Sequence, residues 1–209
     1  MTRNMILIFG GLALLGGLYA SQGAISSVWL LAEAGIDYFY PNTEKPETAS
    51  APGGQAPLSG IAAKFSNSLM TMEDGTPRAL DASRLAGVKY WAFYYSASWC
   101  PPCRAFTPDL VSFYRDFKPS HPDFELIFVN YDRSEDDMLN YMRSDAMPWP
   151  AVWYADIDNP DLDARKYCGN GIPSLVLVDE KGNVLSTVNT FMGYRDPHEV
   201  IADIRSMVK

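Results

Sequence analysis

Two cysteines, Cys100 and Cys103, are separated by two prolines in the segment Trp99-Cys100-Pro101-Pro102-Cys103. Residues 90–95 are apolar and aromatic, which is typical of a buried strand. The apolar residues within 101–118 recur at helical spacing, so Cys100 is expected at the N-terminus of a helix. The free N–H groups and the positive dipole end of a helix stabilise a thiolate there. Cys103, one turn further on, is placed to attack a mixed disulfide formed on Cys100. The pair therefore predicts dithiol–disulfide exchange.

Two other uses of the pair stay open at this point. A disulfide between residues three apart restricts the unfolded chain very little, so a purely structural role would stabilise the fold only slightly. A metal site needs more ligands than two thiolates, and the sequence offers no second cysteine pair. His121 and His198 are too distant in sequence for a zinc pattern and are predicted to be surface or capping residues. Cys168 is predicted to be a packed thiol, with a third redox thiol as the alternative.

The elements that position the cysteines are predicted from hydrophobic periodicity and capping residues. Helices are expected over Pro101–Lys118, after the N-cap Ser134, and after the N-cap Asp196. The buried face of the last helix is expected to contain Val200, Ile201, Ile204, Met207 and Val208. Strands are expected over Tyr90–Tyr95, Phe124–Asn130, Ser174–Val178 and Val184–Val188, the last two joined as a hairpin. This order predicts an α/β fold, a mixed sheet with helices on both faces.

The N-terminal part of the chain has a different composition. Residues 4–32 carry no charge and follow Arg3, and residues 5–20 are strongly apolar, which predicts a signal peptide or an uncleaved membrane anchor within residues 1–40. A buried core helix is the alternative for this segment. Residues 41–60, with four prolines and three glycines, are predicted to be a flexible linker. Residues 61–209 are then predicted to form one domain, exported to the periplasm or another extracytoplasmic space.

Composition excludes several classes of protein. A hydrophobic fraction of 47% rules out a wholly disordered chain, and three cysteines cannot build a disulfide scaffold. The net charge of −8 argues against nucleic-acid binding, which needs a basic surface to displace counterions from phosphates.

Several separated motifs resemble the tryparedoxin and nucleoredoxin branch of the thioredoxin superfamily. They are residues 96–108 (SASWCPPCRAFTP), 113–114 (FY), 132–135 (DRSE), 147–149 (MPW) and 171–176 (GIPSLV). The resemblance covers residues 61–208 and implies a thioredoxin fold, with Cys100 as nucleophile, Cys103 as resolving thiol and no cofactor beyond their redox-active disulfide.

The same resemblance assigns further residues to the site. It implies a cis peptide between Ile172 and Pro173, with Pro173 facing the cysteine pair and exposing backbone for an extended substrate. Trp99 would form part of the substrate rim, where Pro101, Pro102 and Ile172 are also expected to contact substrate. Thioredoxins carry a buried Asp six residues before the first cysteine; here that residue is Tyr94, so the resemblance assigns no proton relay.

Together these observations predict an exported protein-disulfide reductase. Its expected partners are protein or small-molecule disulfides, a redox donor protein and, if the N-terminal segment is uncleaved, the membrane. The combination of this domain with an export segment resembles the membrane-tethered thioredoxin-like reductases of the bacterial cell envelope. Two alternatives remain: a non-catalytic module that binds extended peptides beside Pro173, and a thiolate carrier of copper.

Overall fold

The computed structural model describes residues 57–209. The predicted export segment and most of the predicted linker lie outside these residues. Within residues 57–209, no helix has both the length and the apolar character needed to cross a membrane.

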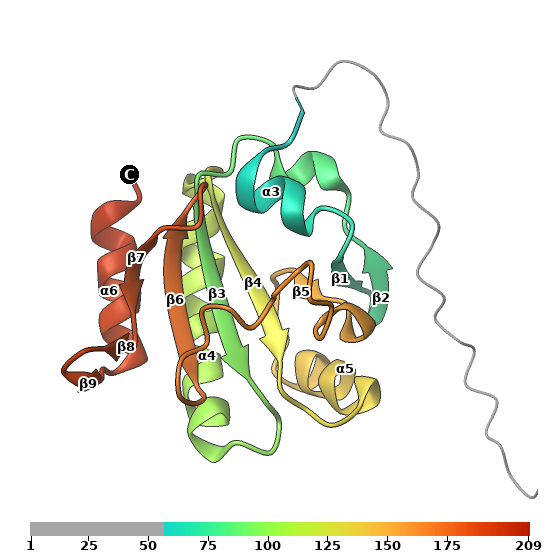
Figure 1. Cartoon of the computed structure of the whole chain (residues 1–209). Helices are drawn as coiled ribbons and strands as arrows, with labels where there is room; N and C mark the ends of the chain where they lie inside the picture. The colour runs from blue at the N-terminus through green and yellow to red at the C-terminus, as the bar shows by residue number, and fades with distance from the viewer. Residues whose placement is uncertain (1–56) are drawn as a thin grey trace, which may run out of the picture. The chain divides into compact units, whose positions relative to one another are not determined.

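A seven-stranded mixed sheet forms the centre of the domain, in the order β2-β1-β5-β4-β3-β6-β7 (Figure 1). Its strands are β1 (Leu69–Glu73), β2 (Thr76–Ala79), β3 (Tyr90–Ser96), β4 (Phe124–Asn130), β5 (Ala151–Val152), β6 (Ser174–Asp179) and β7 (Val184–Thr187). The central strand β3 pairs in parallel with β4 and antiparallel with β6. Apart from the partly buried Tyr90, its aromatic side chains are buried on both faces of the sheet, which explains the nearly continuous apolar run in the sequence.

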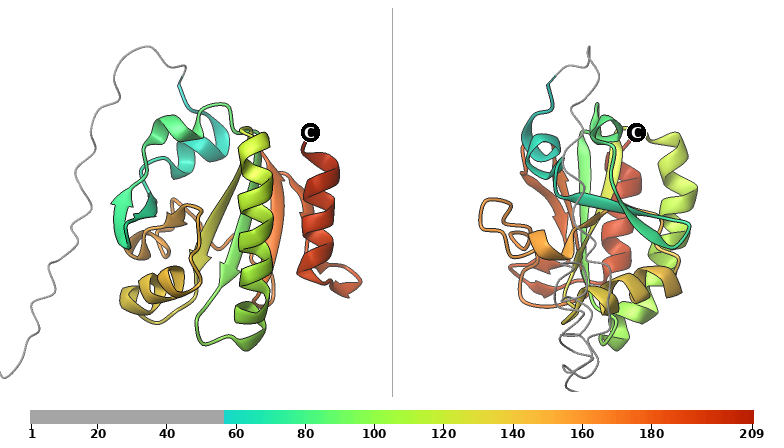
Figure 2. Two further views of the ribbon diagram at one scale, coloured as in Figure 1. Left: turned by 180° about the vertical axis from the view of Figure 1, so that it is seen from behind. Right: turned by 90° about the vertical axis from the view of Figure 1, so that its right-hand side faces the viewer.

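Helices cover both faces of this sheet (Figure 2). On one face lie α4 (Pro101–Phe117), α5 (Glu135–Ser144) and α6 (Pro197–Met207), and on the other lies the short α3 (Gly60–Phe65). Three 3-10 turns, Ala82–Leu85, Lys118–Ser120 and Tyr154–Asp156, and a two-stranded hairpin of β8 (Asn189–Thr190) and β9 (Gly193–Tyr194) complete the described elements. The predicted α/β fold, with helices on both faces of a mixed sheet, is confirmed.

The predicted helix starts are correct. Ser134 Oγ accepts a hydrogen bond from Asp137 N at 3.1 Å, and Asp196 Oδ1 accepts one from His198 N at 2.9 Å. The prediction that Met207 belongs to the buried face of α6 is wrong, because its side chain is 41% exposed. The helix ends at Met207, and Val208 adopts an extended conformation that buries its own side chain instead.

Several short elements carry no periodic signal in the sequence, namely α3, β1, β2, β5 and the β8–β9 hairpin. The start of α3 depends on Gly60, the last residue of the predicted linker. Gly60 has φ +56°, and a Cβ there would lie 2.0 Å from the carbonyl oxygen of Glu180. Ile61 N donates a hydrogen bond to the same oxygen at 3.1 Å, so the close approach secures α3 to the β6–β7 turn.

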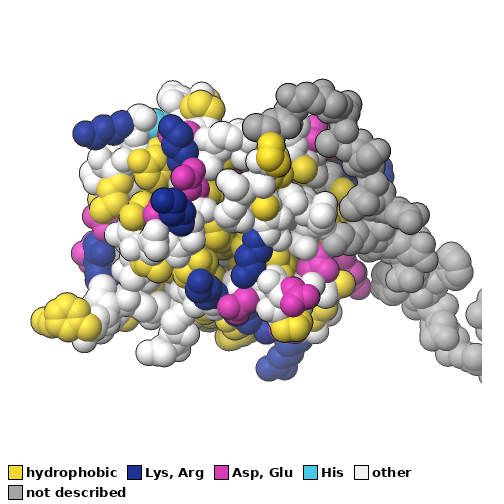
Figure 3. All heavy atoms as spheres, turned by 45° about the horizontal axis from the view of Figure 1, so that its top comes forward, with side chains coloured by type: hydrophobic (Ala, Val, Ile, Leu, Met, Phe, Trp, Pro, Cys, Tyr) yellow, Lys and Arg dark blue, Asp and Glu magenta, His cyan; other side chains and the backbone are white. Residues whose placement is uncertain are grey.

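Figure 3 views the molecule obliquely from the end of the sheet opposite the start of α4. Basic and acidic side chains are interspersed on this face. No broad basic area stands out among the described residues on this face, in keeping with the net charge of −8.

Candidate active site

The cysteine pair lies at the junction between β3 and α4, at the lower edge of the sheet in Figure 1. Cys100 is the N-cap residue of α4, and Cys103 N donates a hydrogen bond to Cys100 Sγ at 3.3 Å. The two sulfurs are joined in a disulfide, with Cα atoms 5.2 Å apart. When the disulfide is reduced, the same N–H group and the helix dipole favour a thiolate on Cys100.

The two sulfur-bearing residues differ in access. Cys103 is fully buried, whereas Cys100 keeps 4% of its surface exposed. Both pack in a small cluster with Ala97, bordered by the partly buried Tyr131 and Ile172. An incoming disulfide therefore meets Cys100 first, and Cys103 is reserved for the second step.

The segment before β6 closes the site on its other side. The Ile172–Pro173 peptide is cis, and Cys100 Sγ lies 3.8 Å from the carbonyl oxygen of Ile172. Tyr194 Oη donates a hydrogen bond to the carbonyl oxygen of Pro173 at 2.7 Å. The carbonyl oxygen of Ile172 thus lies next to Cys100, and Tyr194 binds the carbonyl oxygen of the following residue.

Trp99 stands at the rim of the site. Its side chain is 58% exposed, and its Nε1 donates a hydrogen bond to the carbonyl oxygen of Tyr131 at 3.1 Å. Pro101 and Pro102 are also exposed at the first turn of α4. An open groove of about 730 Å³, lined in part by Trp99, Pro101 and Arg104, runs along this side of the helix. The structure therefore brings the sequence-predicted residues of the rim together around the disulfide.

A buried network of hydroxyl groups lies behind the cysteines, and sequence reasoning missed it. Tyr94 Oη is 2.8 Å from Thr107 Oγ1 and donates to the carbonyl oxygen of Cys103 at 3.3 Å. Thr107 Oγ1 is in turn 2.7 Å from Tyr141 Oη, which is 2.9 Å from Ser96 Oγ. Burial raises the pKa of Tyr94 well above its ordinary value, so its hydroxyl stays protonated. Tyr94 thus connects β3, α4 and α5, and is not a group that gains and loses protons near neutral pH.

Asp132 supports the turn that leads into the site. Its Oδ1 accepts hydrogen bonds from both N and Oγ of Ser98, each at 2.8 Å. Burial raises the pKa of the Asp132 carboxyl, although the bonds from Ser98 oppose this shift. Sequence reasoning used Asp132 only as part of a family motif; its role in holding residues 98–99 becomes visible only when β3 and β4 end side by side.

The remaining cysteine and the histidines lie outside the cysteine pair's cluster. Cys168 is a buried free thiol whose pKa is raised by burial, which agrees with the predicted packed thiol. His198 lies in the first turn of α6, where its backbone N donates to the N-cap Asp196, and its ring bridges Asp196 and Asp109. His121 stacks on Phe117. Among residues 57–209, no group of three or more His, Cys, Asp or Glu side chains is arranged to hold a metal ion.

Comparisons with known proteins agree with this geometry. A thioredoxin-like family model matches residues 87–184. Nucleoredoxin from Bos taurus is 42% identical over 109 residues, which cover 52% of this chain and 24% of nucleoredoxin. A probable nucleoredoxin 1 from Arabidopsis thaliana is 37% identical over 117 residues, covering 56% of this chain and 19% of that protein. The chain thus spans a quarter or less of the length of these relatives.

Solved structures extend the likeness over nearly the whole described domain. Tryparedoxin I from Leishmania major is 31% identical with a TM-score of 0.52, and the match covers 71% of this chain and 95% of that one. Tryparedoxin I from Crithidia fasciculata is 32% identical with a TM-score of 0.51, covering 71% and 92%. The chain belongs to the thioredoxin superfamily and carries a tryparedoxin- and nucleoredoxin-like domain.

Proposed function

We propose that the protein is a thiol–disulfide oxidoreductase that reduces protein disulfides. The observation that carries the proposal is the position of Cys100: its sulfur caps α4, accepts the Cys103 N–H group and is the more exposed of the pair. The similarity to tryparedoxins and nucleoredoxins supports the same chemistry.

The reaction uses only the two thiols of the reduced pair. The Cys100 thiolate attacks one sulfur of the substrate disulfide, and the other substrate sulfur leaves as a thiolate that takes up a proton. Cys103 then loses its proton and attacks Cys100 Sγ, which releases the second substrate sulfur as a thiol. Two electrons pass from the pair to the substrate, and the pair ends as the disulfide present in this structure. A dithiol donor must restore it by the reverse exchange.

The setting of the reaction rests on the sequence. The apolar segment of residues 5–20 supports export, with the domain outside the cytoplasm and held at the membrane if the segment stays uncleaved. A reductant in such a space depends on a redox donor protein, since disulfides persist there. We assign the enzyme no cofactor beyond the Cys100–Cys103 pair.

The test is reduction of insulin by the full-length protein in detergent, with dithiothreitol as donor. We expect Cys100→Ser to reduce the rate to that of dithiothreitol alone, because no thiolate remains to attack. Cys168→Ser is the matched control and should retain the wild-type rate within about twofold, since Cys168 is packed apart from the pair. Full activity of Cys100→Ser would contradict the proposal, and peptide binding unaffected by loss of both cysteines would indicate a binding module instead.

A further inference from the structure

The β8–β9 hairpin presents the two most exposed large apolar side chains among the described residues, Phe191 and Met192, with the exposed Tyr194 beside them. Phe191 is 98% exposed, Met192 is 82% exposed and Tyr194 is 56% exposed. Scattered single apolar residues are ordinary on a surface, but three within four residues on one projecting turn form a patch. Residues 187–194 contain no charged side chain, so an apolar partner could cover the tip without burying a charge.

The hairpin is connected directly to the site. Tyr194 Oη bonds the carbonyl oxygen of Pro173 at 2.7 Å. Asn189 Nδ2 donates to the carbonyl oxygen of Cys168 at 2.9 Å and to Ser174 Oγ at 3.3 Å. Both strands of the hairpin are therefore tied to the segment that carries the cis peptide.

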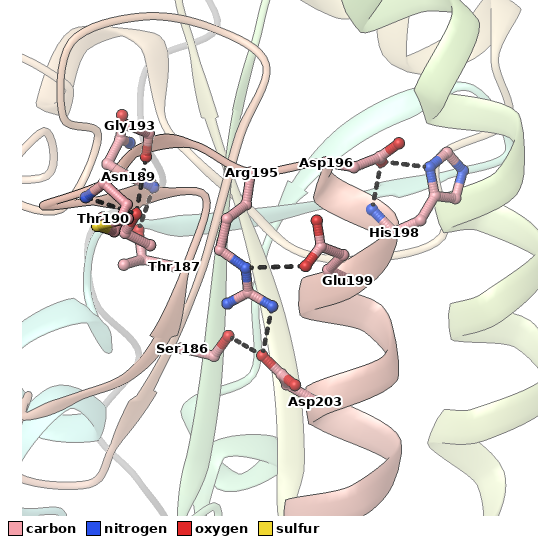
Figure 4. Close-up of polar contacts among 11 residues, drawn as sticks. Ser186, Thr187, Asn189, Thr190, Gly193, Arg195, Asp196, His198, Glu199 and Asp203 are labelled. Atoms are coloured by element: carbon pink, nitrogen blue, oxygen red, sulfur yellow. Dashed lines mark hydrogen bonds and ion pairs between the residues drawn. The ribbon is translucent and has the colours of Figure 1, made fainter.

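Its base is held from the other side by α6 (Figure 4). Arg195, which follows β9, donates to Glu199 at 3.2 Å and to Asp203 at 3.1 Å. Ser186 on β7 donates to the same Asp203 carboxylate at 2.6 Å. Within the tip, Thr190 Oγ1 donates to the carbonyl oxygen of Gly193 and accepts from Met192 N. These bonds hold an apolar tip at a defined place, which reduces the entropy cost of binding to it.

We propose, on the basis of the proposed function, that this hairpin selects protein disulfides in which an apolar side chain lies near the reacting cysteine. A substrate sulfur attached to Cys100 must lie beside Ile172, whose carbonyl oxygen is 3.8 Å from Cys100 Sγ. If the substrate chain continues from this sulfur along Ile172 and Pro173, it reaches Tyr194, whose hydroxyl donates to the carbonyl oxygen of Pro173. Phe191 and Met192 belong to the same hairpin as Tyr194, and on this proposal they cover a flanking side chain of the substrate. A small disulfide has no side chain to place there.

The test compares single-turnover rates of the reduced full-length protein with three disulfides. Two are disulfide-bonded peptides that differ only in Leu or Asn beside the cysteine, and the third is hydroxyethyl disulfide. We expect the wild type to reduce the Leu peptide about tenfold faster than the Asn peptide, equal to about 1.4 kcal/mol, which partial burial of such side chains can supply. The double variant Phe191→Ser, Met192→Ser should lose this preference and keep its rate with hydroxyethyl disulfide within about twofold.

Met207→Ser is the matched control, because it removes an exposed methionine at the far end of α6 and should leave all three rates unchanged. A double variant that keeps the preference, or loses rate equally with all three substrates, overturns the inference. If the double variant keeps the preference and instead loses partition into phosphatidylcholine vesicles, the tip binds a membrane. If it keeps the preference and loses self-association, the tip binds a second copy of the chain. A wild type inactive toward all three disulfides would instead contradict the proposed function.

Discussion

The Tyr94→Phe variant tests whether Tyr94, six positions before Cys100, positions its neighbours or transfers a proton. The change removes one hydroxyl from the buried network. Thr107 Oγ1 still lies 2.7 Å from Tyr141 Oη and 2.9 Å from the carbonyl oxygen of Cys103, so no partner loses every hydrogen bond. The expected cost is therefore that of one hydrogen bond, about 1 kcal/mol of unfolding free energy. With an m-value of about 2 kcal/mol/M, the urea midpoint should fall by about 0.5 M.

The second readout of this variant is the pH dependence of Cys100 alkylation by iodoacetamide. Because Tyr94 stays protonated, the pH at which Cys100 becomes reactive should not move in Tyr94→Phe. Tyr95→Phe is the matched control: it removes a buried hydroxyl that donates to the carbonyl oxygen of Ala164 at 3.0 Å, in a bond that involves neither cysteine. A displacement of the alkylation profile by about one pH unit or more in Tyr94→Phe alone would refute the positioning role.

Two further predictions concern stability. The His198 ring places Nδ1 2.7 Å from Asp196 and Nε2 3.0 Å from Asp109, and these bonds, the one to Asp109 foremost, raise the pKa of His198. Because the pKa is higher in the folded state, protonated His198 stabilises the fold. This contribution is complete below the unfolded pKa of about 6.5 and is lost as pH rises through the folded pKa. Wild type should thus exceed His198→Gln in urea midpoint by more at pH 5.5 than at pH 9, and an equal difference at both would contradict the ion pairs. Gly60→Ala should lower the unfolding free energy by about 2 kcal/mol or more, because both its positive φ and the Glu180 carbonyl oxygen oppose a Cβ. Gly87→Ala, at φ +80° with open space around it, should cost only about 1 kcal/mol, and equal losses would show that the contact with Glu180 has no effect.

The main elements of the fold could be predicted because their residues carry local signals. The aromatic run of β3 and the caps Ser134 and Asp196 act within a few neighbouring positions, and the structure has each of them at the expected place. The β5 strand has only two residues, and β8 and β9 have two each, which is too short for periodicity to identify.

The site could be predicted only in part for a similar reason. Two cysteines only three positions apart show their chemistry in the sequence, but Tyr94, Thr107 and Tyr141 meet through contacts that span up to 34 positions. Nothing in the pattern around Tyr194 indicates that its hydroxyl reaches Pro173, 21 positions earlier. Met207 shows the opposite error: it fits the periodic face of α6, yet the helix ends there and its side chain stays at the surface.

The central claim is that Cys100 attacks and Cys103 resolves, and the covalent intermediate tests it most directly. Reduced Cys103→Ser, mixed with a single-disulfide peptide, should gain the mass of one substrate half, and peptide mapping should locate it on Cys100. Wild type should show no lasting adduct, because Cys103 displaces it. An adduct on Cys168, or none at all in Cys103→Ser, would contradict the account.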